Sequence, residues 1–344
     1  MPAKIEGVIR VAIIGSGGIS GAHGRGLLEY KDRIQCVALC DISEANLKTR
    51  SEQLGGVKAW YNDWKVMLKE MGPQLDAVLI CLPHHLHAAA ILDAAAAHKH
   101  ILCEKPMCIS LTEADQILEV VRKSGITYMS AHNQLFMASV QEARNLIDQG
   151  EIGTIYWIRS QDCFLAGGGK GDPFKGSWRA KLETQGGGEL IDTGYHPTYR
   201  LLYLAKAAIT GVRGSMGRYV QGIEGEDTAS VQVRFDNGVL GEIFTSWAMP
   251  LPYGTPHIHV IGSKGQIYGT GNDLFILRNG AETPEKIELP NVETFTEQIR
   301  HFADCLNYGR RPIHGPEEGK AVLDVILNAS RDADGWQPHA QKKV

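Results

Sequence analysis

The sequence predicts an α/β protein with a parallel sheet in its N-terminal part and an α+β part after it, whose sheet is open and mainly antiparallel. Two observations predict this fold class. Strand-like and helix-like segments alternate as far as Ser130, which is typical of parallel βαβ units. Beyond that point, short strand-like segments follow one another across turn signals such as Asp236-Asn237-Gly238, as antiparallel hairpins require.

Apolar β-branched runs and helical spacing define the elements of the first part. We expect strands at residues 8–14, 35–40, 77–82, 100–103 and 127–130, and helices at 19–30, 44–53, 87–98 and 111–124. We interpret residues 61–65 as an amphipathic surface segment. A parallel sheet of this kind is buried on both faces and binds ligands beyond the carboxyl ends of its strands. Gly15, Asp41, Pro83 and Lys105 all fall at such ends.

The second part is expected to begin with a helix and to end with two. We predict helices at 140–149, 294–308 and 317–332, and strands at 155–161, 228–235, 240–247, 257–262, 266–270 and 274–277. A mainly antiparallel sheet with helices on one face fits this order. We place the domain boundary near His132, which divides the chain into residues 1–131 and 132–344.

Composition excludes several classes of protein. The 344 residues carry 35 Lys plus Arg against 39 Asp plus Glu, a formal charge of −4, whereas proteins that bind nucleic acid or membrane surfaces show a basic face or tail. No run approaches the roughly 18 apolar residues of a membrane-spanning helix, and the N-terminus lacks the pattern of a signal peptide. Seven cysteines without a Cys-x-x-Cys pair favour reduced thiols, so we expect a cytoplasmic protein.

A phosphate-binding turn is the first functional motif. Gly15-Ser16-Gly17-Gly18-Ile19-Ser20 follows a strand and opens a helix, with Ser20 where a glycine or alanine is usual. The first glycine allows the tight turn, and the second lets a pyrophosphate approach the helix N-terminus. Asp41 ends the second strand, where an acidic residue binds the adenosine ribose and repels a 2′-phosphate. Only Ile42-Ser43-Glu44 follows it, so we predict a Rossmann domain that binds NAD rather than NADP. The alternative is a structural strand–turn–helix.

A lysine at a strand end is the second motif. Glu104-Lys105-Pro106 follows the fourth predicted strand, and such a lysine can donate to the substrate oxygen whose charge changes during hydride transfer. An ordinary surface turn is the alternative. The histidines of Pro83-His84-His85-Leu86-His87 have no cysteine or carboxylate at the spacing of a metal site, so we predict no metal. Each is expected to be a satisfied loop histidine or a cofactor contact.

A carboxylate and a histidine follow a triple glycine. Asp192 and His196 come after Gly186-Gly187-Gly188 and lie four residues apart, so they share one face of a helix. A neighbouring carboxylate raises the basicity of a histidine, which makes His196 a candidate general base for a hydroxyl proton. Pro197 disfavours helical geometry at His196, so we expect the helix to kink or to start late. A buried Asp–His pair with a structural role is the alternative.

Together these motifs resemble the Gfo/Idh/MocA oxidoreductase family, which includes glucose–fructose oxidoreductase and inositol dehydrogenases. The likeness extends over nearly the whole chain through further segments: Asn133-Gln134-Leu135-Phe136, Gly150-Glu151-Ile152-Gly153, Ser177-Trp178-Arg179 and Asp227-Thr228-Ala229-Ser230. The resemblance implies that Lys105, Asp192 and His196 are the catalytic residues. Ser20, Gln134-Leu135 and the glycine-rich residues 166–171 depart from the family pattern, and these departures concern substrate contacts more than hydride chemistry.

The motifs and the resemblance imply the remaining site residues. Cofactor contacts are expected from Gly15, Ser16, Gly17, Gly18, Ile19, Asp41, Leu82, Pro83, His87, Glu104, Lys105, Trp178 and Arg179. Substrate contacts are expected from Lys105, Asn133, Trp178, Arg179, Asp192 and His196, with Glu183 as a further hydrogen-bonding group.

The functional hypothesis is an NAD-dependent oxidoreductase that moves hydride between nicotinamide and a secondary hydroxyl of a sugar, glycoside or cyclitol. Residues 1–131 then bind the dinucleotide, and residues 132–344 serve substrate binding and oligomerisation. Two alternatives stay open. One is redox-neutral oxidation of a glycoside with a tightly held NAD, ending in a keto-glycoside or in cleavage, and the other is a non-catalytic NAD-sensing regulator. The open sheet also predicts a homo-oligomer, a dimer or a tetramer, with no nucleic-acid or membrane partner.

Overall fold

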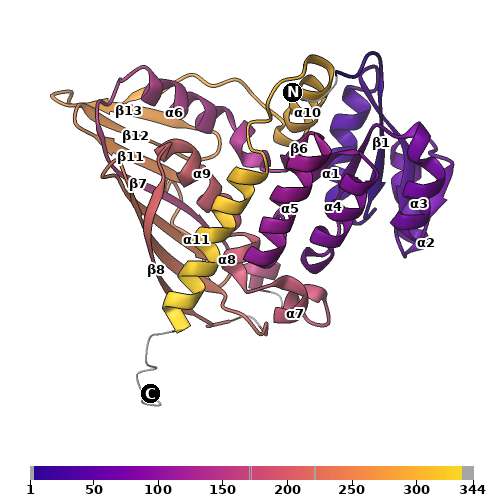
Figure 1. Ribbon diagram of the computed structural model, residues 1–344. Helices are drawn as coiled ribbons and strands as arrows, with labels where there is room; N and C mark the ends of the chain where they lie inside the picture. Colours follow the sequence, from indigo (N-terminus) through magenta and orange to yellow (C-terminus); the bar gives the residue numbers. More distant parts are fainter. Residues whose placement is uncertain (1–3, 170, 172, 221, 335–344) are drawn as a thin grey trace. The chain divides into compact units, whose positions relative to one another are not determined.

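The computed structural model describes residues 4–169, 171, 173–220 and 222–334, and the chain divides into two compact units (Figure 1). The first unit comprises the chain up to Phe136 together with Val292–Ala321. The second comprises Met137–Asn291 and the chain from Val322 onward. The sequence boundary near His132 lies four residues before the end of the first segment, but residues 292–321 belong to the first unit and not to the C-terminal part.

The first unit is built on a six-stranded parallel sheet with the strand order β3-β2-β1-β4-β5-β6. Its strands are β1 (Ile9–Ile14), β2 (Ile34–Cys40), β3 (Ala59–Tyr61), β4 (Ala77–Ile80), β5 (His100–Cys103) and β6 (Tyr128–Ser130). The helices between them are α1 (Gly18–Glu29), α2 (Glu44–Gln53), α3 (Trp64–Met71), α4 (His87–Ala96) and α5 (Leu111–Ser124). The predicted parallel sheet is confirmed. Because the strand order reverses between β1 and β4, their carboxyl ends form the position where such sheets bind ligands.

Residues 61–65, interpreted as an amphipathic surface segment, are exposed or half-buried, and they join a strand and a helix that the sequence did not predict. Tyr61 ends β3, which pairs with the carboxyl half of β2. Trp64 begins α3, and the side chain of Asp63 caps this helix by accepting the N–H of Lys65 at 2.7 Å. A strand of three residues at a sheet edge is too short to give a periodic pattern.

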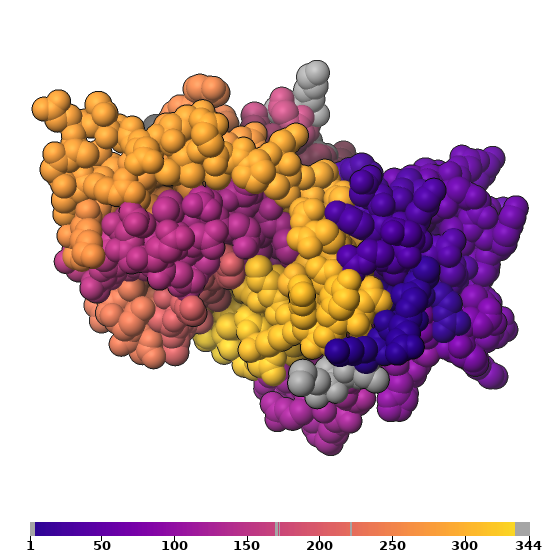
Figure 2. Space-filling view, turned by 90° about the horizontal axis from the view of Figure 1, so that it is seen from above, coloured from indigo at the N-terminus to yellow at the C-terminus, as the bar shows by residue number. Residues whose placement is uncertain are grey.

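The helix α10 (Thr294–Tyr308) joins the first unit because its apolar face packs there. Ile299 and Phe302 are buried in the same cluster as the residues of β1. On α1, a Cβ at Gly26 would lie 2.9 Å from Cγ1 of Ile299, so this glycine allows the two helices to approach closely. The orange-yellow surface of this segment lies beside the indigo N-terminal residues in Figure 2.

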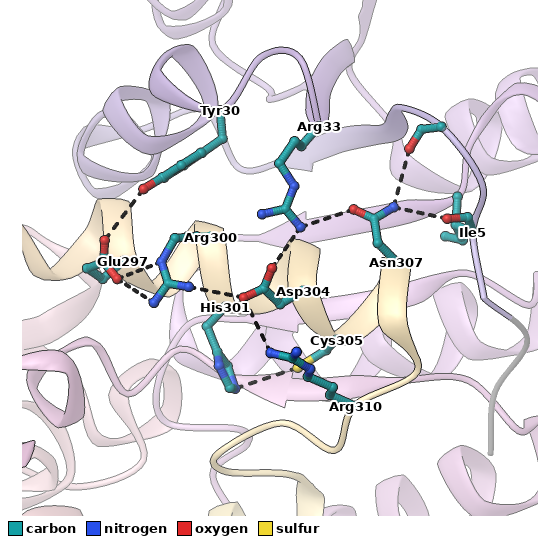
Figure 3. A network of polar contacts seen from close by, with 11 residues as sticks. Ile5, Tyr30, Arg33, Glu297, Arg300, His301, Asp304, Cys305, Asn307 and Arg310 are labelled. Atoms are coloured by element: carbon teal, nitrogen blue, oxygen red, sulfur yellow. Dashed lines mark hydrogen bonds and ion pairs between the residues drawn. The ribbon is translucent and has the colours of Figure 1, made fainter.

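Polar contacts hold the other side of α10 (Figure 3). The carboxylate of Asp304 accepts from Nη2 of Arg33 at 2.7 Å and from Nη1 of Arg300 at 3.0 Å. Asn307 accepts from the same Arg33 at 3.2 Å and donates to the carbonyl of Ile5 at 3.0 Å. These contacts tie α10 to the segment before β1 and to the residue that precedes β2, which explains why residues so late in the sequence belong to the N-terminal unit.

The second unit contains an eight-stranded sheet with the order β14-β13-β12-β11-β7-β10-β9-β8. Its strands are β7 (Ile155–Cys163), β8 (Ile209–Gly217), β9 (Thr228–Phe235), β10 (Leu240–Ser246), β11 (Ile258–Gly262), β12 (Gly265–Gly269), β13 (Leu274–Arg278) and β14 (Glu285–Ile287). Neighbouring strands pair antiparallel except β7 and β10, which run parallel. The predicted mainly antiparallel sheet is confirmed, although β8 and β14 were not expected.

Helices cover one face of this sheet. They are α8 (Glu189–Asp192), α9 (Tyr195–Ala205) and the later part of α11 (Pro316–Asp334), which begins in the first unit. The helix α6 (Ala138–Asp148) packs against α9, and the short α7 (Leu182–Gln185) precedes α8 along the chain. The strand side chains on this face, such as Ile158, Val231 and Ile243, are fully buried. The alternate side chains, such as Trp157 and Phe244, are only half-buried. Within the described ranges, no helix is both long enough and apolar enough to cross a membrane.

Candidate active site

The glycine loop after β1 has the geometry of a phosphate-binding turn. Gly15 has a φ of +92°, and a Cβ there would lie 2.4 Å from the carbonyl oxygen of Cys81. A Cβ on Gly17 or Gly18 would instead meet no atom within 4 Å, and Ile19 beside them is exposed. Because Gly18 is the first residue of α1, this open space lies at a helix N-terminus, where N–H groups bind anions. The loop therefore fits the pyrophosphate of a dinucleotide.

Asp41 connects this loop to the end of β2. Its Oδ2 accepts the N–H of Ser16 at 2.7 Å, and its Oδ1 accepts the N–H of Ser43 at 2.8 Å and Nδ2 of Asn46 at 3.3 Å. A carboxylate offers about four acceptor sites, so these contacts leave capacity for a ribose hydroxyl. The half-buried position of Asp41 fits the predicted ribose contact.

The turn that carries Lys105 is held from α1. Glu104 is 6% exposed, and its Oε1 lies 2.7 Å from Nε2 of the fully buried His23. The other carboxylate oxygen of Glu104 accepts the N–H of Lys105 at 3.1 Å. On the far side of the ring, Nε2 of Gln298 lies 3.5 Å from Nδ1 of His23. Glu104 therefore supports the half-buried Lys105, and the turn that contains both residues is not an ordinary surface turn.

His87 links the same turn to the end of β4. Its Nδ1 lies 2.6 Å from the carbonyl oxygen of Pro106, and its Nε2 lies 2.8 Å from that of Leu82. The side chain is fully buried, whereas Leu82 and Pro83 are half-buried. Burial lowers the pKa of His87 below its ordinary value. The structure thus gives His87 two backbone partners, and a direct cofactor contact remains only a prediction.

Two other predictions concern the first unit. Among the residues that the structure describes, no group of three or more histidine, cysteine, aspartate or glutamate side chains could hold a metal ion. Asn133, expected as a substrate contact, donates from Nδ2 to the hydroxyl of Thr294 at 3.1 Å.

In the second unit, the triple glycine before Asp192 packs against Glu226. A Cβ on Gly188 would lie 2.1 Å from the carbonyl oxygen of Glu226. That carbonyl accepts the N–H of Glu189 at 2.8 Å, and the side chain of Glu226 accepts the N–H of Leu190 at 3.0 Å. Glu226 therefore caps the start of α8, and the glycines allow its close approach. This contact fixes the position of the helix that ends at Asp192.

Asp192 and His196 lie on two successive short helices. α8 ends at Asp192, and α9 begins at Tyr195. Pro197 has no N–H to donate to the carbonyl of Thr193, and this carbonyl instead accepts the N–H of His196 at 2.9 Å. The helical segment is interrupted at Thr193 and Gly194, but His196 and Pro197 both lie in the first turn of α9, so the helix does not start later than His196.

The side chains around Asp192 form an arginine-centred group. Nε of Arg179 donates to Oδ2 of Asp192 at 2.7 Å, with the two side chains 41% and 6% exposed. The Arg179 guanidinium also lies 4.3 Å from the centre of the Trp178 ring. The ring of the half-buried His196 is held by Tyr199, whose hydroxyl lies 2.6 Å from Nδ1. The structure thus brings Trp178, Arg179 and Asp192 together and fixes His196 through a residue that the sequence did not suggest.

A buried carboxyl lies close to this group. Glu189 is fully buried, and the hydroxyl of Thr245 donates to its Oε1. Burial raises the pKa of Glu189 well above its ordinary range, and the neighbouring carboxylates, Glu226 foremost, raise it further. Its surroundings therefore disfavour the charged form of Glu189, and the carboxylate that pairs with Arg179 is that of Asp192.

Comparison with protein families agrees with this geometry. Residues 9–132 match an oxidoreductase family with an NAD-binding Rossmann fold, and residues 140–268 match the GFO/IDH/MocA C-terminal domain. The chain belongs to the Gfo/Idh/MocA oxidoreductase family. The resemblance found in the sequence is confirmed.

Individual Gfo/Idh/MocA proteins resemble the chain over nearly its whole length. The scyllo-inositol 2-dehydrogenase (NAD(+)) of Bacillus subtilis is 28% identical over 97% of this chain and 96% of its own. The myo-inositol 2-dehydrogenase of Thermotoga maritima is 28% identical over 92% of this chain and 93% of its own. A levoglucosan dehydrogenase solved with NADH and levoglucosan has a TM-score of 0.85 at 20% identity, covering 95% of this chain and 97% of that one. The last comparison shows a shared fold.

Sequence reasoning missed several residues that hold predicted site residues within each unit. Arg50 lies under the glycine loop, His23 holds Glu104, and Tyr199 holds His196. The only sequence signal for Arg50 is its spacing of three residues from Leu47 on the buried face of α2. Glu183, expected to contact substrate, is exposed on α7.

Proposed function

We propose that this chain is an NAD-dependent dehydrogenase that moves hydride between nicotinamide and a secondary hydroxyl of a sugar, glycoside or cyclitol. The observation that carries the proposal is the near-full-length similarity to two inositol 2-dehydrogenases, in a chain that retains Lys105 beyond β5 and Asp192 and His196 after the triple glycine. Asp41, with no basic residue in the three positions after it, favours NAD over NADP.

Side chains of this chain accept the hydroxyl proton and donate a hydrogen bond to the reacting oxygen. When bound, NAD supplies the hydride acceptor and, in its reduced form, the donor. We assign the hydroxyl proton to Nε2 of His196, because Tyr199 engages Nδ1. The O–H electron pair becomes the second C–O bond as the C–H pair leaves with the hydride. Nζ of Lys105 donates to that oxygen throughout and stabilises its changing charge.

The arginine-centred group is assigned to the rest of the substrate. Asp192, held by Arg179, accepts from a neighbouring hydroxyl, and the exposed part of Arg179 donates to another. Trp178 offers an aromatic face next to them, and aromatic faces pack against the apolar face of a sugar ring. A polyol can contact Asp192, Arg179 and Trp178 at once, whereas a simple alcohol can contact only His196 and Lys105.

Replacement of His196 tests the chemical assignment. General base assistance contributes about 10²–10⁴-fold, so His196→Ala should lower kcat by that factor while the Kd for NAD stays unchanged. Tyr199→Phe is the matched variant, since it keeps the imidazole and removes only its Nδ1 partner, and it should lower kcat far less. A His196→Ala enzyme with near-normal kcat would remove His196 from the proton-transfer role.

A substrate screen tests the reaction class. Monosaccharides, inositols and glycosides are incubated with NAD while the absorbance of reduced nicotinamide is followed. Accumulating NADH supports the proposed dehydrogenase. An altered sugar without net NADH, together with NAD retained through gel filtration, would support the redox-neutral alternative. NAD binding without turnover of any of these compounds would support the regulator.

We also propose that the uncovered face of the second sheet pairs with another copy of this chain. Half-buried side chains such as Trp157, Ile261, Tyr268 and Phe275 lie on that face, and the Tyr268 and Phe275 rings stack at 5.6 Å. Static light scattering should give a mass above that of one chain, and Trp157→Glu should reduce it. A monomeric wild-type protein would refute this assembly.

A further inference from the structure

Arg50 is a buried cation beneath the glycine loop. It lies on α2 and is 6% exposed. Its Nη2 donates to the carbonyl of Gly17 at 2.9 Å, and its Nε donates to the hydroxyl of Ser20 at 2.9 Å. Nη1 contacts Oε1 of Gln53. Burial lowers the pKa of Arg50, yet an arginine remains charged at neutral pH.

No carboxylate of the residues that the structure describes pairs with this charge. Among residues 4–169, 171, 173–220 and 222–334, no aspartate or glutamate forms an ion pair with Arg50, and its hydrogen-bond partners are all neutral. A buried charge without an opposite charge is costly. The arrangement therefore calls for a negative charge from outside the chain.

The Gly17–Gly18 peptide bond connects Arg50 to the open space of the loop. This peptide is trans, as the one cis bond found in the described residues is Lys105–Pro106. In a planar trans peptide the C=O and the N–H point in opposite directions. Since the carbonyl of Gly17 faces Arg50, the N–H of Gly18 points away from it, at the N-terminus of α1. A hydrogen bond to the carbonyl polarises the peptide and strengthens the N–H as a donor.

Two unusual features of the motif follow from Arg50. Ser20, which stands where a glycine or alanine is usual, donates its hydroxyl to the carbonyl of Gly17 at 2.7 Å and accepts from Arg50. A Cβ on Gly21 would lie 2.6 Å from Nη1 of Arg50. Ser20 therefore supplies a partner for the guanidinium, and Gly21 leaves the space that it fills.

We propose that Arg50 is a positioning residue for the cofactor's pyrophosphate, acting through the Gly17–Gly18 peptide, and that the pyrophosphate supplies the missing negative charge. The proposal rests on dinucleotide binding as part of the proposed function. Arg50 on α2 would then contribute to the affinity for the pyrophosphate, whereas Asp41 contributes to the affinity for the adenosine ribose.

The test separates pyrophosphate from nucleoside binding. The full-length protein is titrated with NAD and with ADP-ribose, and adenosine is measured by competition against NAD. Arg50→Met should weaken NAD and ADP-ribose by about tenfold or more, since tenfold corresponds to about 1.4 kcal/mol and one hydrogen bond to a charged group is worth at least that. Adenosine should bind as before, and the salt dependence of NAD binding should decrease.

Three further variants complete the experiment. Arg10→Met is the matched control, because it removes an arginine of the same unit that pairs with Asp76 at the surface, and it should change no ligand's Kd. Arg50→Lys keeps the charge without the planar donor fork, so it should lose NAD affinity by a few-fold and retain the salt dependence. Ser20→Ala keeps the guanidinium and should have the smallest effect. If Arg50→Met fails to fold, the latter two variants carry the test with the same three ligands.

Two results would overturn the proposal. One is unchanged NAD and ADP-ribose binding in folded Arg50 variants. The other is an equal loss for adenosine, which would mean that Arg50 only maintains the shape of the loop. Failure of the wild-type protein to bind NAD at all would instead contradict the proposed function.

Discussion

Replacement of His87 tests how the turn of Lys105 is held. The ring lies between two backbone carbonyls, that of Pro106 at 2.6 Å and that of Leu82 at 2.8 Å, and it is fully buried. Because burial lowers the pKa of His87, the imidazole is neutral at pH 7 and has one N–H. One of the two contacts is then a hydrogen bond, and His87→Ala removes it.

The expected magnitudes follow from this geometry. A buried carbonyl left without its donor costs about 1–3 kcal/mol, and a large-to-small change in a core adds a cavity term. We therefore expect His87→Ala to lower the free energy of unfolding by about 2–5 kcal/mol. A displacement of about 1 Å at a catalytic group can cost 10²-fold in rate, so kcat should fall by about that factor through Lys105.

Two conservative variants identify the contact that matters. Asn at position 87 can place a donor near the Nδ1 position, toward Pro106, whereas Gln can place one near Nε2, toward Leu82. If the hydrogen bond to Pro106 holds the turn, His87→Asn should retain most of kcat and His87→Gln should not. The assay combines steady-state kinetics, NAD titration and urea unfolding. A direct cofactor contact predicts a higher Kd for NAD with little change in kcat, and that result would refute the positioning role.

Three other predictions follow from single contacts. Asp41→Ala should raise the Kd for NAD and reduce the ratio by which the protein prefers NAD to NADP. If a fluorescence titration gives unchanged Kd values for both cofactors, Asp41 does not bind the ribose. Burial lowers the pKa of His314 to about 3 from 6.5. The unfolded chain therefore takes up a proton at this histidine below pH 6.5 while the folded chain does not, and the free energy of unfolding decreases as the pH falls. Between pH 7 and 5, urea unfolding of His314→Phe should show a decrease about 2 kcal/mol smaller than that of the wild type. Gly188→Ala places a Cβ 2.1 Å from the carbonyl of Glu226 and should cost at least about 1–3 kcal/mol, more than Gly187→Ala, whose Cβ meets a side chain at 3.1 Å.

Elements with a complete local pattern could be predicted from the sequence. The predicted bounds of α2, α5, β9 and α10 are those of the structure. β9 alternates, α5 and α10 are amphipathic, and all three helices have a side chain at the N-cap that accepts a backbone N–H. Local propensity and tertiary packing agree in these segments, so the sequence is sufficient.

Elements that depend on a neighbour could not be predicted. β8 contains Gly211, Gly214 and Gly217, and glycine is depleted in strands. It forms a strand because β9 pairs with it, and Gly214 fits against the backbone of Ala329 on α11. The parallel pairing of β7 with β10 has no local signal at all, since it depends on the path of the chain between them.

The candidate site divides in the same way. The glycine loop and Asp41 were found because each stands at a strand end with a recognisable spacing. His23 and Glu104 are 81 residues apart, and Arg50 reaches the loop from another helix. Supporting side chains of this kind are selected by three-dimensional contact, and nothing in their own sequence neighbourhood distinguishes them from ordinary core residues.

The glycines illustrate why a motif alone does not determine the role of its residues. Gly17 and Gly18 face open space at the start of α1, while Gly15 and Gly21, in the same short segment, face protein atoms at 2.4 and 2.6 Å. The first two leave room for a ligand, and the other two leave room for the chain itself. In the sequence all four are the same residue. Their roles differ because of what lies opposite each missing Cβ, and for Gly21 that is the guanidinium of Arg50. The same loop therefore serves both cofactor binding and helix packing. A substitution at Gly17 or Gly18 should affect cofactor binding, whereas one at Gly15 or Gly21 should affect packing against the residue opposite it.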